Sequence, residues 1–331
     1  MAELLGITPQ ALFGQLLVGL INGSFYAILS LGLAIIFGLL NIINFTHGAQ
    51  YMMGAFIAWI GFYKLGEWVG NPDLVVNYWW SLLLAPLAVG AFGILIEKTL
   101  LKRLYHLDHL YGLLLTFGIA LICEGLFRTW FGISGLRYDV PAQLTGGQNL
   151  GFMFMPNYRA WVVVASLAVC FVTWFVIERT KLGSYLRAGT ENPRLLQAFG
   201  INVPLMITLT YGYGVALAAF AGVLAAPIFQ VNPLMGSNLI IVVFAVVVIG
   251  GMGSIAGAIV TGVGLGLIEG VVKSGVIATV IDKATSGSPI VAQAIYPVKL
   301  LFQPEASAVI IFVVMVIVLL VRPAGLFGRE K

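Results

Sequence analysis

Residues 238–273 have the sequence NLIIVVFAVVVIGGMGSIAGAIVTGVGLGLIEGVVK. Nearly every side chain is apolar, and the stretch is much longer than the about 20 residues that one helix needs to cross a bilayer. A glycine-rich run, Gly250-Gly251-Met252-Gly253-Ser254, interrupts it. Such breaks are tolerated in membranes where the backbone is buried in protein or lines a cavity. We therefore expect either two crossings or a re-entrant pair of half-spans.

The rest of the chain is equally apolar. Of its 331 residues, 60% are hydrophobic and only 9% are charged, whereas about a quarter of a typical soluble chain is charged. The sequence predicts an all-α polytopic membrane protein with about eight transmembrane helices in a single domain, residues 1–331. The first stretch could be one tilted helix or two segments broken at Asn22-Gly23-Ser24. The predicted spans besides 238–273 are 11–43, 47–65, 78–97, 111–131, 160–178, 205–229 and 306–322.

Positive charge predicts the orientation, because cytoplasmic loops of membrane proteins are enriched in lysine and arginine. Three segments carry such charges, so we expect loops 98–109 and 179–204 and the tail 322–331 on the cytoplasmic side. The segment 274–305 would then lie outside, as would loops 66–77, 132–159 and 230–237. The basic residues are Lys98, Lys102 and Arg103, then Arg179, Lys181, Arg187 and Arg194, then Arg322, Arg329 and Lys331.

Small residues recur every four positions after the glycine-rich run. Residues at this spacing share one face of a helix, and small ones let a neighbouring backbone approach closely in a membrane. We expect helix packing along this face. The series is Gly250, Ser254, Ala258, Gly262, Gly266 and Gly270, and a second one is Gly214, Ala218, Gly222 and Ala226.

Polar side chains inside apolar spans are candidates for a solute pathway. The run from Asn41 to Gln50 joins two spans and contains Asn44, Thr46 and His47; Asn22 forms a weaker site upstream. One interpretation is a polar cap or turn. The other is a bend that faces the pathway, to which the break at Gly250, Gly251, Gly253 and Ser254 would also contribute. Two pairs, Glu124 with Arg128 and Glu269 with Lys273, are spaced for ion contacts within a helix.

The loop 179–204 contains Thr190-Glu191-Asn192-Pro193, which resembles a helix start. Leu195, Leu196 and Phe199 would form an apolar face, and Gly200 would end the helix. A short amphipathic helix of this kind can dock into a groove on a partner; an ordinary connecting loop is the alternative.

Motifs for catalysis or metal binding are missing from the sequence. No glycine precedes a lysine, which excludes a Walker A phosphate loop, and there is no His-Glu-x-x-His motif or cysteine–histidine cluster. Cys123 and Cys170 lie in apolar runs, so we expect them to pack between helices. The chain is therefore predicted to be no enzyme and to bind no metal or cofactor; nucleotide hydrolysis would need another subunit.

Several motifs together resemble the permeases of branched-chain amino acid ABC importers, in the same order over nearly the whole chain. They are Ile43-Asn-Phe-Thr-His-Gly48, Arg187-Ala-Gly-Thr-Glu-Asn-Pro193, Ala198-Phe-Gly-Ile-Asn202, Ala221-Gly-Val-Leu-Ala225, Gly250-Gly-Met-Gly-Ser-Ile-Ala-Gly-Ala258 and Arg322-Pro-Ala-Gly-Leu-Phe-Gly328. The strict Glu-Ala-Ala coupling motif of other importer classes is not present. About 30 residues between Ser274 and the turn Pro304-Glu-Ala-Ser307 exceed the family's usual connection.

The resemblance implies a multi-pass subunit of a bacterial inner membrane that works by alternating access. Its partners would be a second homologous permease, two cytoplasmic ATPases that hold ATP and Mg, and a periplasmic solute-binding protein, with lipid around it and no nucleic acid. The residues implied in ATPase coupling, within 179–204, are Arg187, Glu191, Asn192, Leu195, Ala198 and Gly200. The alternative is a secondary transporter or channel for a small polar solute such as urea or an amide.

Overall fold

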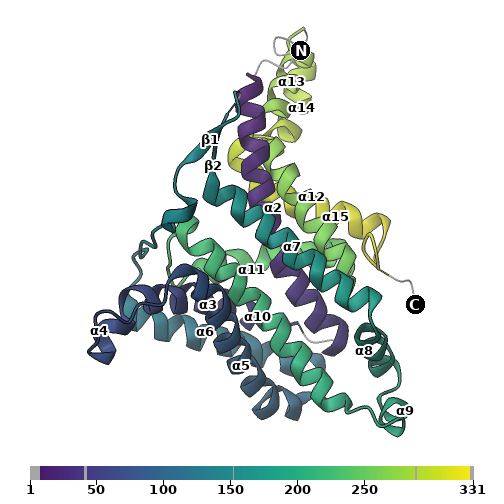
Figure 1. The fold of residues 1–331 in the computed structure, drawn as a ribbon. Coiled ribbons are helices and arrows are strands. Elements are labelled where there is room, and N and C mark those ends of the chain that lie inside the picture. The colour runs from purple at the N-terminus through teal and green to yellow at the C-terminus, as the bar shows by residue number, and fades with distance from the viewer. Residues whose placement is uncertain (1–7, 41–42, 152, 288, 329–331) are drawn as a thin grey trace.

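The computed structural model describes residues 8–40, 43–151, 153–287 and 289–328, which form a bundle of helices (Figure 1). Seven helices of this part are long and apolar enough to cross a membrane, and α11 is a shorter apolar helix. The predicted all-α polytopic class is confirmed. The long helices are α2 (Pro9–Leu40), α5 (Tyr78–Thr99), α6 (His109–Phe131), α7 (Asn157–Arg179), α10 (Val203–Phe229), α12 (Ile255–Lys273) and α15 (Ser307–Val321).

Shorter elements connect and fill the bundle. α3 (Thr46–Tyr63) and α11 (Met235–Gly250) lie among the long helices, and a hairpin of β1 (Gly147–Asn149) and β2 (Phe154–Pro156) follows α6. The other helices lie at the two ends of the bundle (Figure 1). They are α4 (Leu65–Val69), α8 (Lys181–Glu191), α9 (Pro193–Ala198), α13 (Val276–Thr285) and α14 (Pro289–Leu301), with the 3-10 turns η1 (Leu101–Leu104), η2 (Ala142–Leu144) and η3 (Pro304–Ala306).

The central element is α2, a single helix of 32 residues. It continues through Asn22-Gly23-Ser24, so the alternative of two broken segments is not what forms. Ser24 satisfies its hydroxyl within the helix by donating to the Ile21 carbonyl at 2.7 Å. At about 1.5 Å per residue the helix is roughly 48 Å long, more than the thickness of a bilayer core. It is buried on nearly all sides between residues 21 and 36.

The most extensive helix–helix interface in the bundle is that between α2 and α12, which run antiparallel. Gly262 lies against Ala27, Gly266 against Gly19 and Gly23, and Gly270 against Gln15. Ser30 donates to the Ala258 carbonyl at 3.1 Å. The small-residue series of α12 therefore lies along α2, where missing side chains bring the two backbones into direct contact.

α10 forms the second packing centre, against α2, α3 and α5. Gly54 of α3 contacts the backbone of Ala219, and Gly222 of α10 contacts the backbone of Tyr51. Helices that approach this closely have little freedom to shift independently without separating. α2, α3 and α10 thus form a common core from which the more exposed helices α5, α6, α7 and α15 extend.

The glycine-rich run forms a tight turn between α11 and α12. Gly251 and Gly253 both have positive φ, 98° and 84°, which only glycine adopts at low cost. The Ser254 side chain caps α12 by accepting from the Gly257 N–H at 3.1 Å. The tail closes the other side, because the N–H groups of Leu326 and Phe327 donate to the Ile249 and Gly250 carbonyls.

Several segments in which basic residues cluster lie together at one end of the bundle, called here the basic end. It comprises loop 100–108, helices α8 and α9, the turn 251–254 and residues 322–328 (Figure 1). The opposite end holds α4, the β-hairpin, α13 and α14 (Figure 1). The extra segment before Pro304 thus forms two helices, joined by an ion pair of 2.5 Å between Asp282 and Lys299.

Of the two charge pairs predicted within helices, one forms an ion pair and the other does not. Lys273 contacts the buried Glu269 at 2.5 Å, and the Tyr26 hydroxyl donates to the same carboxylate at 2.8 Å. Within the described part of the chain, Glu124 and Arg128 form no ion pair. They lie on α6, whose surface is largely exposed and whose side chains can extend separately toward the interface.

Replacing Lys273 by methionine should lower the stability of the purified protein, because it leaves a buried carboxylate with the Tyr26 hydroxyl as its remaining partner. We expect a loss of about 2 kcal/mol, visible as a lower Tm in detergent. The matched control is Lys299→Met, which removes the more exposed pair with Asp282 and should change stability by less than about 1 kcal/mol. Equal Tm shifts for both variants would contradict the assignment.

Candidate functional site

The basic end presents the short helices α8 and α9 outside the bundle. Asn192 begins α9 by accepting from the Leu195 N–H at 3.0 Å, with Pro193 in the first turn. Gly200, with a φ of 81°, reverses the chain after α9. Asn202 then starts α10 by accepting from the Leu205 N–H at 3.1 Å. Two capped helix starts and one glycine turn therefore fix the path of this segment.

The apolar side chains of this segment point in two directions. Leu196 is buried, whereas Leu195 is 55% and Phe199 76% exposed. The predicted single apolar face is thus divided into one side chain that anchors α9 to the protein and two that are free to contact a partner. The remaining predicted coupling residues Glu191, Asn192, Ala198 and Gly200 are also exposed.

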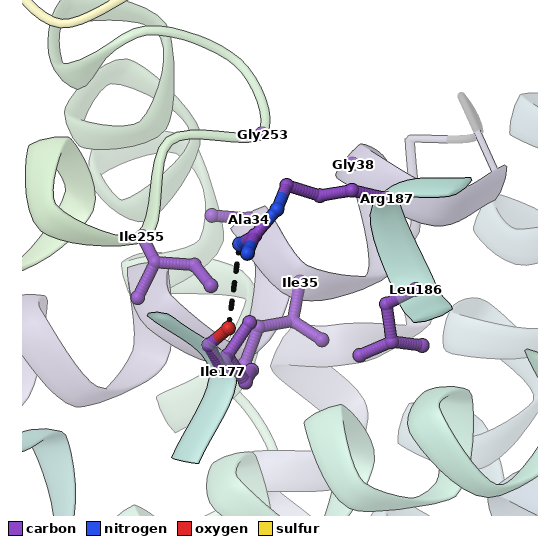
Figure 2. A pocket seen from close by; sticks show the side chains of 8 residues that line it. All are labelled: Ala34, Ile35, Gly38, Ile177, Leu186, Arg187, Gly253 and Ile255. Atoms are coloured by element: carbon purple, nitrogen blue, oxygen red, sulfur yellow. Dashed lines mark hydrogen bonds between the residues drawn. The ribbon is translucent and has the colours of Figure 1, made fainter. Parts of the chain in front are cut away.

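Arg187 connects α8 to the bundle. Figure 2 shows its side chain extending into a small pocket between α2, α7, α8 and α12, with Gly38 and Gly253 above it in this view. The pocket has a volume of about 80 Å³. The guanidinium donates to the Ile177 carbonyl at 3.3 Å and pairs with Glu178 at 3.4 Å. Arg187 therefore joins α8 to the end of α7, in a pocket that Gly38 of α2 and Gly253 of the glycine turn also line.

The glycine turn places its residues differently. Gly253 lines the Arg187 pocket and lies against Gly38, so the structure brings this predicted pathway residue next to a predicted coupling residue. Gly250 and Gly251 are buried, with Gly257 against Gly250 and the tail residues Gly325 and Gly328 against Gly251. Ser254 is occupied in capping α12.

A second cluster of polar residues lies at the start of α3. Asn44, Thr46, His47 and Gln50 are all fully buried. Thr46 donates to the Thr116 carbonyl at 2.8 Å, and His47 Nε2 lies 3.0 Å from the Leu29 carbonyl. These contacts hold the start of α3 between α2 and α6. The polar run is therefore an interior feature of this conformation.

The amides in this cluster are incompletely hydrogen-bonded. Asn44 Nδ2 donates to Gln50 Oε1 at 3.3 Å, and the Tyr211 hydroxyl of α10 lies beside both side chains. Asn44 Oδ1, Gln50 Nε2 and the Tyr211 hydroxyl oxygen have no hydrogen-bond partner among the described residues. Unsatisfied buried polar atoms are costly, so this cluster is a place where a rearrangement of the helices carries little additional penalty.

Asn22 and Asn41 do not join this cluster. Asn22 is half-buried on α2, seven residues from Leu29, which is roughly 10 Å along the helix. Asn41 lies outside the described residues. The cluster is instead completed by Thr116 and Tyr211, which sequence reasoning did not single out because hydroxyl groups within apolar spans are common and satisfy themselves within a helix.

Glu97 is the other residue that the sequence did not reveal. It is the last residue of the predicted span 78–97 and precedes Lys98, a pattern typical of an interfacial charge. In the structure its side chain is buried, and it accepts hydrogen bonds from Tyr105 and Thr208. No short motif marks it, because both donors come from other segments of the chain.

The side chains at these sites are suited to binding contacts. The described residues contain no group of three or more histidine, cysteine, aspartate or glutamate side chains that could hold a metal ion. The polar side chains are amides and hydroxyls that can contact a solute or a neighbouring helix, and the exposed α8–α9 segment offers apolar contacts to another protein.

Comparison with known proteins agrees with this arrangement. The family model for the branched-chain amino acid transport system permease component matches residues 15–319. The chain is 28% identical to the high-affinity branched-chain amino acid transport system permease protein BraD of Pseudomonas aeruginosa and 26% identical to LivH of Escherichia coli strain K12; 96% of each chain is covered in both comparisons.

A probable permease protein LivM of Methanocaldococcus jannaschii is 28% identical over 42% of this chain and 40% of that protein. No solved structure matches the chain. Since the family model covers most of the sequence, and the relatives agree over nearly the full length, the chain belongs to the family of branched-chain amino acid transport permease components.

Proposed function

We propose that this chain is the membrane-spanning subunit of an ATP-driven importer for amino acids, with branched-chain amino acids as the solutes. The observation that carries the proposal is the α8–α9 segment. It exposes Leu195 and Phe199 to a partner while its Arg187 reaches between α2 and the glycine turn. A force applied to the exposed side chains would therefore reach the transmembrane core.

The proposed assembly pairs this chain with a second homologous permease, two cytoplasmic ATPases and a periplasmic binding protein. The existence of relatives named LivH and LivM supports a pair of different permeases. ATP and Mg would be held by the ATPases, and this chain would carry no cofactor. Nucleic acid has no role in the assembly, and lipid surrounds it.

The basic end would face the cytoplasm of a bacterial cell, with the C-terminus on that side of the inner membrane, because basic residues favour the cytoplasmic side. The ATPases would then meet α8 and α9 directly. The opposite end, with α13 and α14, would face the periplasm, where the binding protein delivers its solute.

The mechanism would be alternating access. Nucleotide binding brings the ATPases together, and their movement displaces α9 and the start of α10. This movement then reaches the start of α3, and the polar residues Asn44, Thr46, His47 and Gln50 become part of the route for the solute, with Asn22 farther along α2. Solute would shift the balance between states only by its different affinity for them.

The test is transport by the reconstituted assembly. We expect concentrative leucine uptake into vesicles that requires ATP, the ATPases and the binding protein together. The same vesicles with this chain alone are the control and should show no concentrative uptake. Robust uptake by the chain alone, without ATPases, would overturn the proposal and favour a secondary transporter or channel.

A further inference from the structure

Glu97 is a buried carboxylate at the last turn of α5 for which the described residues offer no cation. Its side chain is about 1% exposed. Tyr105 donates to Oε1 at 2.6 Å and Thr208 to Oε2 at 2.7 Å. The neighbouring Lys98 is exposed and forms no ion pair with it. Two hydroxyl groups, one for each oxygen, are therefore what compensates this charge.

The two donors come from different parts of the basic end. Tyr105 follows η1 in the loop that leads to α6, and burial, followed by its hydrogen bond to Glu97, raises the pKa of Tyr105 well above its usual value. The tyrosine therefore remains a protonated donor at physiological pH. Thr208 lies near the start of α10, which follows α9 after the short turn 199–202.

The first turns of α10 contact two elements at once. Thr208 and Tyr211 are three residues apart and so lie on the same side of the helix. Thr208 holds α5 through Glu97, and Tyr211 lies beside Gln50 of α3 and Asn44 just before it. Close glycine contacts between α5 and α10, at Gly90 and Gly212, bring these helices together along the same side.

The contact of Thr208 with Glu97 and the contact of Tyr211 with the amides differ in what it costs to break them. A buried carboxylate that loses one of its two donors is penalised more than a neutral group, because charged hydrogen-bonding groups are the most costly to leave unsatisfied. The neutral amides near Tyr211 already contain unpaired atoms. When α10 moves, α5 should therefore follow it.

We propose that Glu97 is the positioning residue that makes α5 move with α10 when the α8–α9 segment is displaced. The inference rests on the proposed function, since it assigns a task within ATP-driven transport. It adds a contact outside the α8–α9 segment.

The first experiment uses Thr208→Val in the complete reconstituted assembly. The variant keeps the shape of the side chain and removes the donor to Glu97. We expect ATP hydrolysis to continue while the amount of leucine imported per ATP falls about tenfold. Thr210→Val is the matched control, because the Thr210 hydroxyl donates to Met206 within its own helix at 2.8 Å, and its import per ATP should equal that of the wild type.

The second experiment measures movement directly. Spin labels at Leu95 of α5 and Leu209 of α10, both exposed, report the distance between the two helices with and without ATP. In the wild type this distance should stay constant, and in Thr208→Val it should change when ATP is added. A constant distance in both proteins would overturn the inference.

Two further variants separate the role of Glu97 in linking α5 to α10 from an effect on the stability of the protein alone. If Glu97 acts through Thr208, then Glu97→Gln combined with Thr208→Val should lower import per ATP no more than Thr208→Val alone. If Thr208→Val does not assemble, Tyr105→Phe decides the question and should also reduce import per ATP. A variant with lower Tm but unchanged import per ATP would contradict the inference, while wild-type vesicles without ATP-dependent uptake would refute the proposed function itself.

Discussion

Gly266→Ala should severely destabilise the protein, and we expect it to prevent α2 and α12 from packing. A Cβ atom on Gly266 would lie 2.3 Å from the Gly23 Cα and 2.4 Å from the Gly19 carbonyl oxygen. Both are backbone atoms of the buried helix α2, so no side-chain rotation can relieve the overlap. The helices would have to separate, at a cost of about 3 kcal/mol or more.

The measurement is the yield of monodisperse protein in detergent and its Tm. Gly264→Ala is the control, because it lies on the same helix two residues away and a Cβ there would meet nothing within 4 Å. It should behave as the wild type or gain slightly in helix stability. Wild-type yield and Tm for Gly266→Ala would show that the two helices are not packed as described.

Phe199→Ser should abolish ATP-driven uptake without affecting the fold. The ring is 76% exposed at the end of α9, so its removal leaves no cavity in the bundle. If it is an aromatic anchor for the ATPase, its loss should weaken that interface by 2 kcal/mol or more, which is at least about a thirtyfold reduction in affinity. We expect leucine uptake to fall to the level of vesicles without ATPases.

Co-purification of the ATPases with the tagged permease measures this directly. Phe154→Ser is the matched control, because Phe154 is similarly exposed on β2 at the opposite end. That variant should retain its ATPases and its Tm. Normal ATPase binding and uptake by Phe199→Ser would place the docking site elsewhere on the basic end.

The elements that sequence could predict are those that depend on local pattern. Length and hydropathy identified the spanning helices, and Asn192, Pro193 and Gly200 marked the ends of α9. The four-residue spacing of small side chains on α12 coincides with its contact to α2. Each of these signals lies within one segment of the chain.

The interior polar contacts depend on pairs of distant segments and left no such signal. Lipid and protein core are both apolar, so hydrophobic periodicity does not show which side of a membrane helix faces its neighbours. The polar start of α3 therefore suggested a solute route or a cap, and its full burial against α2, α6 and α10 followed only from the structure. Glu97 likewise resembled an interfacial charge.

The hydrogen bonds between the tail of the chain and the end of α11 have a consequence for biogenesis. Two carbonyl groups there, those of Ile249 and Gly250, obtain their hydrogen bonds from Leu326 and Phe327, which the ribosome makes long after α11 has entered the membrane. Until then these groups depend on water or on the insertion machinery. A nascent chain should consequently leave this end of α11 without its protein hydrogen bonds until residues 326 and 327 have been made.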